Sequence, residues 1–153
     1  MMNHLINLSD SGIVQRLAVE QTMKCNDFTQ KFGLTLTKTQ AFELVSARAR
    51  SLDSCGRIEF GGGVVEKLIF AFCDSPYICQ DNYAQTMHEL IECFYFYKNE
   101  TLDLCSDDEL IDFMKKSFDS VCHGSVELLR NRELEKMAVA LRYGLPLQNE
   151  ESK

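Results

Sequence analysis

The segment with the most evident capacity for chemistry is RIEFGGGVVEKLIFAF, in which three consecutive glycines precede a helix-like stretch with one lysine. Free N–H groups at the start of a helix carry a partial positive charge, so glycines at such a place can bring the backbone close to an anion. The sequence therefore offers a candidate site for a small anionic ligand. Its residues would be Arg57, Gly61, Gly62, Gly63 and Lys67.

This segment matches neither of the familiar phosphate-binding motifs. A P-loop requires GxxxxGK followed by Ser or Thr, whereas Lys67 lies four residues after Gly63 and is followed by Leu68. The GxGxxG pattern fails because its sixth position is Glu66. The alternative interpretation is structural: glycines allow positive φ angles and let the backbone pass close to a neighbouring helix. We favour this structural turn and retain the anion site as a hypothesis.

Histidines, cysteines and acidic residues do not form a predicted metal site. His4, His88 and His123 include no pair at i, i+4, and no HExxH or Cys/His ligand spacing occurs. An EF-hand loop begun at Asp103 would carry Asp108 where glycine is required. We interpret the acidic cluster as the solvated start of a helix. Its residues are Asp103, Asp107, Asp108, Glu109 and Asp112. No catalytic signature is present, and we predict neither a metal nor a cofactor.

A run of four aromatic residues is the second candidate site. Phe94, Tyr95, Phe96 and Tyr97 end the longest helical pattern of the chain. A helix end that is apolar on every side must be covered, either by the protein's own core or by another chain. Tyrosine is favoured at interfaces because its ring buries area while its hydroxyl remains hydrogen-bonded. The two alternatives, core packing and an interface with a subunit or partner, both stay open at this point.

Composition describes an ordinary globular chain with an acidic second half. Of 153 residues, 45% are hydrophobic, and the net charge is −7. Residues 77–153 carry fifteen acidic against eight basic side chains, which disfavours binding to nucleic acid. The longest apolar run of consequence has six residues against the roughly 20 that a membrane span requires. Seven cysteines without a CxxC pair favour a reduced, cytoplasmic protein.

Apolar periodicity predicts an all-α fold. We expect a single compact bundle of five to six helices with the glycine-rich connection near its centre. The expected helices lie within residues 12–33, 38–55, 64–75, 81–101, 106–118 and 125–144. In the first of these, six apolar residues fall roughly on one side, namely Ile13, Leu17, Val19, Met23, Phe28 and Phe32. Capping boxes are predicted at Thr37 with Gln40 and at Ser106 with Glu109. One domain should span residues 1–145, followed by a flexible polar tail at 146–153.

Three segments of the chain carry a resemblance to a known group of proteins. They are KCNDFTQKFGLTLT, GRIEFGGGVVEKLIFAFCDSPYICQDNYAQTM and SDDELIDFMKKSFD. Together they resemble an uncharacterised family of small bacterial proteins, a domain of unknown function found mainly among Gram-positive anaerobes. The resemblance implies a bacterial cytosolic setting. It brings no activity, cofactor or catalytic residue.

Two functional hypotheses follow from these features. The first is a non-enzymatic interaction module that self-associates or docks on a larger protein partner through an apolar helical face. It depends on the aromatic run and on the lack of a catalytic motif. The alternative is an enzyme or sensor that binds a small anionic ligand near Arg57, the glycines and Lys67. Neither hypothesis includes a nucleic acid or a membrane as partner.

Overall fold

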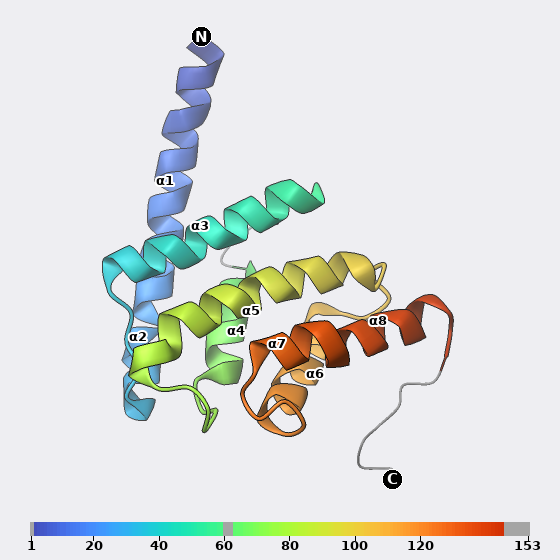
Figure 1. Cartoon of the computed structure of the whole chain (residues 1–153). Helices are drawn as coiled ribbons and strands as arrows, with labels where there is room; N and C mark the ends of the chain where they lie inside the picture. Colours follow the sequence, from blue (N-terminus) through green and yellow to red (C-terminus); the bar gives the residue numbers. More distant parts are fainter. Residues whose placement is uncertain (1, 60–62, 146–153) are drawn as a thin grey trace.

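The computed structural model describes residues 2–59 and 63–145, with side chains from residue 12 onward. The described chain is helical and contains no strand, so the predicted all-α bundle is confirmed (Figure 1). The six longer helices are α1 (Met2–Lys24), α3 (Lys38–Cys55), α4 (Gly63–Phe72), α5 (Gln80–Glu100), α6 (Asp107–Asp119) and α8 (Leu134–Arg142). The short elements are α2 (Asn26–Thr29), η1 (Gln30–Phe32), α7 (Val126–Leu128) and η2 (Leu129–Glu133). The tail predicted at 146–153 lies outside the described residues.

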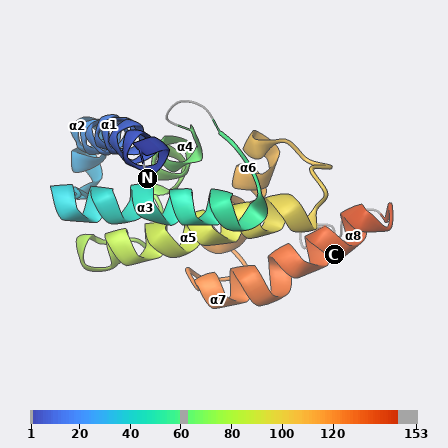
Figure 2. The same ribbon diagram turned by 90° about the horizontal axis from the view of Figure 1, so that it is seen from above.

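Helix α5 is the centre of the arrangement. It lies side by side with α3, and α7 and α8 pack along it on the side away from α3 (Figure 2). Helices α4 and α6 contact each other and also pack against α5. The first half of α1 extends beyond the other helices (Figure 1). One continuous apolar core reaches from Cys25 to Ala138.

Among the six longer helices, α4, with ten residues, is the most deeply buried for its length. Leu68, Ile69 and Phe72 are completely buried, which agrees with the prediction that this segment lies near the centre. Burying one such side chain stabilises the fold by about 1.5–3 kcal/mol. The edge-to-face contact of Phe72 with Phe118 joins α4 to α6, with ring centroids 5.4 Å apart.

Both predicted capping boxes are present. The Thr37 hydroxyl accepts from the Gln40 N–H at 3.1 Å, and the Gln40 side chain accepts from the Thr37 N–H at 2.9 Å. Ser106 and Glu109 form the same reciprocal pair at the start of α6. Each box satisfies N–H groups that have no partner inside the helix. These local signals fix where α3 and α6 begin.

The expected first helix is interrupted, and only part of the side predicted from its periodicity is buried. Helix α1 ends at Lys24, and the following α2–η1 segment turns Cys25 and Thr29 toward the interior. The Thr29 hydroxyl donates to the Leu34 carbonyl at 2.8 Å, which satisfies this buried polar group. Of the six apolar residues predicted to share one side, Val19 is buried and Met23 is partly buried, whereas the other four are 40–55% exposed. These four are Ile13, Leu17, Phe28 and Phe32.

The expected last helix contains a π-helical turn at η2 that periodicity did not predict. Here the hydroxyl of Tyr97 on α5 shares its one proton between two acceptors, the Arg130 carbonyl at 2.7 Å and Glu135 Oε1 at 3.0 Å. A π turn interrupts the regular i to i+4 bonding of a helix. The two hydrogen bonds of Tyr97 therefore hold the irregular turn against α5.

Candidate functional site

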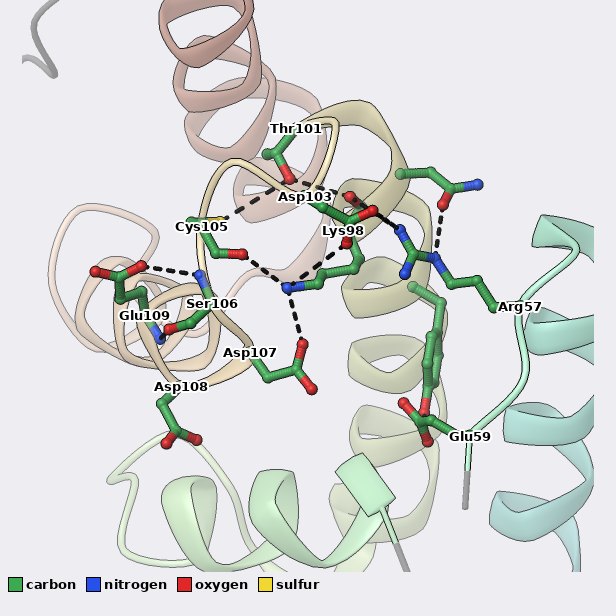
Figure 3. A network of polar contacts seen from close by, with 12 residues as sticks. Arg57, Glu59, Lys98, Thr101, Asp103, Cys105, Ser106, Asp107, Asp108 and Glu109 are labelled. Atoms are coloured by element: carbon green, nitrogen blue, oxygen red, sulfur yellow. Dashed lines mark hydrogen bonds and ion pairs between the residues drawn. The ribbon is translucent and has the colours of Figure 1, made fainter.

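Residues on both sides of the glycines in sequence take part in four ion pairs, which we call the ion-pair group. Each pair joins side chains from different parts of the fold. The pairs are Arg48 with Glu59 (3.0 Å), Arg57 with Asp103 (2.7 Å), Lys98 with Asp107 (2.9 Å) and Lys67 with Asp108 (3.0 Å). Four cationic side chains thus pair with four carboxylates, and Lys98 also lies 3.8 Å from Asp103. Figure 3 shows the part of this group around Lys98.

Arg57 is bound to the connection between α5 and α6. Its Nε donates to Asn99 Oδ1 at 2.7 Å and its Nη2 donates to Asp103 Oδ2 at 2.7 Å (Figure 3). The hydrogen bond from Arg57 holds the pKa of Asp103 below its usual value. Leu102 and Asp103 have φ angles of 57° and 58°, in a region that side chains other than glycine seldom adopt. Arg57 therefore helps to hold a strained turn.

Lys98 contacts the same α5–α6 connection from the side that faces the protein. Its side chain is 11% exposed, and its ammonium group donates to the Cys105 carbonyl at 2.7 Å and pairs with Asp107 at 2.9 Å. Asp107 is the first residue of α6, where the helix dipole also favours a negative charge. The acidic start of α6 is therefore paired with cations as well as exposed to solvent.

Glu59 is the common hydrogen-bond acceptor for Arg48 and Tyr95, in the less exposed part of the ion-pair group. One carboxylate oxygen, Oε1, accepts hydrogen bonds from Arg48 Nε at 3.0 Å and from the Tyr95 hydroxyl at 2.7 Å. Burial, and after it the hydrogen bond to this carboxylate, raises the pKa of Tyr95 above its ordinary value. The Tyr95 hydroxyl therefore remains a donor at neutral pH. It does not act there as a general base.

The structure gives a physical reason for one of the three glycines. Gly63 begins α4 with φ = 65°, and a Cβ at this position would lie 2.5 Å from Glu59 Oε1 and 3.2 Å from the Arg48 guanidinium. Any side chain here would both strain the backbone and press on the Arg48–Glu59 pair. For Gly63 this supports the structural interpretation. Gly61 and Gly62 lie outside the described residues.

The structure does not bring the cations of the predicted anion site together as free charges. Arg57 points to the α5–α6 connection, and Lys67 pairs with Asp108 at the start of α6. An incoming anion would have to compete with a carboxylate already at 2.7 or 3.0 Å. The anion site remains a prediction, and it now requires that at least one ion pair open.

The aromatic run is divided between core and surface. Phe94, Tyr95 and Tyr97 are at most 3% exposed and lie in the protein's own core, where a partner cannot reach them. Phe96 is 52% exposed. Of the four residues predicted for an interface, it alone presents its ring to solvent, because the other three side chains point toward the packed neighbours of α5.

A different aromatic cluster lies on the surface, and sequence analysis did not single it out as a site. Phe28, Phe32 and Phe70 are 40–45% exposed and in contact, with ring centroids 5.8 Å apart for Phe28–Phe32 and 5.5 Å for Phe28–Phe70. The Lys31 ammonium lies 4.4 Å from the centre of the Phe28 ring. We call these three phenylalanines the phenylalanine surface. A helical period placed Phe28 and Phe32 on one side, and only the fold shows that this side faces solvent.

A shallow groove between α4 and α6 continues from this surface. It has a volume of about 490 Å³. Phe70 belongs to both features, and Ala71 and Ile111 supply further apolar lining. Its polar rim includes the Lys67–Asp108 pair and Lys115, which pairs with Asp74 at 2.6 Å. The arrangement suits an apolar side chain surrounded by polar contacts.

Three of the buried thiols are poorly suited to nucleophilic chemistry. All seven cysteines are free. Burial raises the pKa of Cys25, Cys93 and Cys122 to about 11, so these thiols are protonated at neutral pH. Among the side chains that the structure describes, in residues 12–59 and 63–145, no cluster of three or more His, Cys, Asp or Glu could hold a metal ion. No helix in that part of the chain is long and apolar enough to cross a membrane.

The fold and the site define a small all-α chain with a group of paired ionic side chains and an exposed aromatic surface. A family of unknown function (DUF6323) matches residues 21–147, and the chain belongs to that family. The predicted membership of an uncharacterised family is thereby confirmed. No curated protein and no solved structure matches the chain.

Proposed function

We propose that this protein is a protein-interaction module that receives a partner on the phenylalanine surface. The observation that carries the proposal is the contact of three half-exposed phenylalanine rings, Phe28, Phe32 and Phe70, on one face. Water is an unfavourable neighbour for such rings, and covering them gains roughly 25 cal/mol for each Å² removed from solvent. Contiguous apolar patches on soluble proteins often mark interaction sites.

The groove beside Phe70 supports the same proposal. An apolar anchor from a partner can lie against Ala71 and Ile111, while the ion pairs at the rim keep water out of the contact. The phenylalanine surface and the groove both fall within residues 21–147, the range matched by the family. The phenylalanine rings themselves take no part in the ion-pair group, whose Lys67–Asp108 pair forms part of the groove rim.

The free cysteines support a cytoplasmic location for this module. Seven thiols without a disulfide are typical of a reducing compartment. Four of them, including Cys25 and Cys93, are buried and act as small apolar core residues. We therefore expect the partner to be a cytoplasmic protein.

The test is site-specific photo-cross-linking in the bacterial cytoplasm, with benzoylphenylalanine in place of Phe70. The matched control carries the same probe in place of Phe96, which is 52% exposed against 45% for Phe70 but lies on α5. We expect a defined cross-linked product from position 70 and none from position 96, identified by mass spectrometry. A product from position 96 alone would overturn the proposal and move the docking site to α5, and products from neither position would also overturn it.

A further inference from the structure

We infer that the chain's own residues 146–153 bind in an open groove along η2 and α8, with Leu147 as an apolar anchor and Glu150 and Glu151 as an acidic end. The groove has a volume of about 560 Å³. Its lining belongs to other elements than the phenylalanine surface, so the inference is independent of the proposed function. It also differs from the flexible tail that the sequence predicts.

The groove follows one face of the helical stretch formed by η2 and α8. Residues three to five positions apart share a face of a helix, and the lining repeats with this spacing. It consists of Asn131, Arg132, Glu135, Lys136, Val139 and Ala140, together with Leu145. The end of the groove at η2 is therefore polar and charged, whereas the end near the close of α8 is apolar. Such a groove suits an extended segment with one apolar and one charged end.

The end of α8 leads the chain to the apolar end of the groove. The Leu145 N–H donates to the Ala140 carbonyl at 2.7 Å, and Gly144 has φ = 67°. This arrangement closes a helix and brings the residue after the glycine back against the last helical turn. Leu145 accordingly lines the groove itself. Because Pro146 cannot continue a helix and favours extended backbone before it, the following segment starts from this point in an extended form.

The charged end of the groove lies within reach of the acidic part of the segment. Arg132 precedes Ala140 by eight residues, which is roughly 12 Å along a helix. The five residues from Leu145 to Glu150 span up to roughly 17 Å when extended. A segment that runs antiparallel to α8 therefore carries its glutamates to the charged end and leaves Leu147 over the apolar end.

The charges of the groove and the segment are complementary. Arg132 and Lys136 are exposed and contact the same buried carboxylate of Glu133, at 2.7 Å and 3.7 Å. Guanidinium and ammonium groups each have several N–H donors, so both cations can also hold a carboxylate of the segment. Glu135 lines the groove too, but its Oε1 accepts a hydrogen bond from Tyr97 on α5 at 3.0 Å. The two cations therefore favour an acidic occupant.

The first test is photo-cross-linking within the purified full chain, with benzoylphenylalanine in place of Leu147. The experiment uses about 1 µM protein, far below the millimolar effective concentration of a tethered segment. We expect a product within one chain, which mass spectrometry locates between residues 131 and 140. A product that joins two chains, or one that lies on other helices, would overturn the inference.

Charge reversal in the same chain separates binding from the mere proximity of a tethered segment. The double change E150K/E151K should lower the yield of this product roughly fivefold, because attractions to Arg132 and Lys136 become repulsions. Lys136→Glu added to these changes should restore most of the yield. Each variant should keep the thermal midpoint of the wild type, since the Lys136 side chain is 55% exposed. Equal yields in all variants would contradict the inference, and so would a loss that Lys136→Glu fails to restore.

Discussion

The ion-pair group and the phenylalanine surface represent opposite uses of conspicuous side chains. In the ion-pair group, Arg48, Arg57, Lys67 and Lys98 each meet a carboxylate within the chain. On the phenylalanine surface, three large apolar rings remain half exposed. Residues that suggest ligand chemistry are thus used to hold the fold together, and residues of a type expected in the core are available to a partner. Charged groups that are paired within the chain stabilise the fold, whereas apolar rings that the chain leaves uncovered are available to a partner.

The largest expected effect tests whether the fold requires glycine at position 63, beside the Arg48–Glu59 pair. Gly63→Ala should lower the free energy of unfolding by about 3 kcal/mol, because it adds a steric conflict with Glu59 to the cost of a positive φ angle. Gly56→Ala is the matched control, with φ = 67° and open space around the added Cβ, and should lose only about 1 kcal/mol. Urea unfolding measures both. Equal losses would show that the Arg48–Glu59 pair does not require glycine at position 63.

A smaller effect should come from removing one hydroxyl from the ion-pair group. Tyr95→Phe should lower the free energy of unfolding by about 2 kcal/mol, since it removes a buried donor to a charged carboxylate. Tyr83→Phe is the control, because the Tyr83 hydroxyl is buried and makes no well-formed hydrogen bond within the described part of the chain. Its removal should change stability by less than about 0.5 kcal/mol. If Tyr83→Phe proved the more costly change in urea unfolding, the role given to Glu59 would be wrong.

Alkaline pH should lower the free energy of unfolding through the buried thiols. The rings of the phenylalanine surface do not titrate and should not contribute to this change. Burial raises the pKa of Cys25, Cys93 and Cys122 from 9.0 to about 11. The unfolded chain therefore releases these protons at lower pH than the folded chain. The corresponding stability is complete below pH 9 and is lost as the pH rises toward 11. We expect the urea midpoint to fall over that window, with a shallower fall in Cys93→Ala. A midpoint that stays level up to pH 11 would contradict the assignment.

The smallest expected effect concerns the predicted anion site. Because Arg57 and Lys67 are paired with carboxylates, inorganic phosphate should not raise the thermal midpoint more than an equal ionic strength of sodium chloride does. Differential scanning calorimetry gives this comparison directly. A phosphate-specific increase that disappears in Arg57→Ala would instead favour the alternative function, an enzyme or sensor for a small anion.

Much of the fold could be predicted because its signals are local. The capping boxes at Thr37 and Ser106 and the apolar face of α5 depend on residues three or four positions apart. The end of α1 at Lys24 and the π turn at η2 could not be predicted in this way, since neither is marked by glycine or proline. The π turn depends instead on Tyr97, which lies 33 residues from Arg130 in the sequence.

The sites were harder to predict than the helices for a related reason. Periodicity shows that Phe28 and Phe32 share a side, but only tertiary packing decides whether that side is covered. The partner of Arg57 is Asp103, 46 residues further along the chain, and a motif search does not connect them. The acidic cluster did indicate the start of a helix, yet its role as a set of counter-charges required the three-dimensional arrangement.

The distance in sequence between Arg57 and Asp103 also has a kinetic consequence. A contact across 46 residues can form only after the intervening helices α4 and α5 have brought its two ends together. The ion pair should therefore be largely absent from the transition state for folding and complete only in the native protein. Interactions formed this late slow unfolding and leave the folding rate nearly unchanged. The Arg57–Asp103 pair would thus add to the lifetime of the folded molecule and have little effect on how fast the molecule folds.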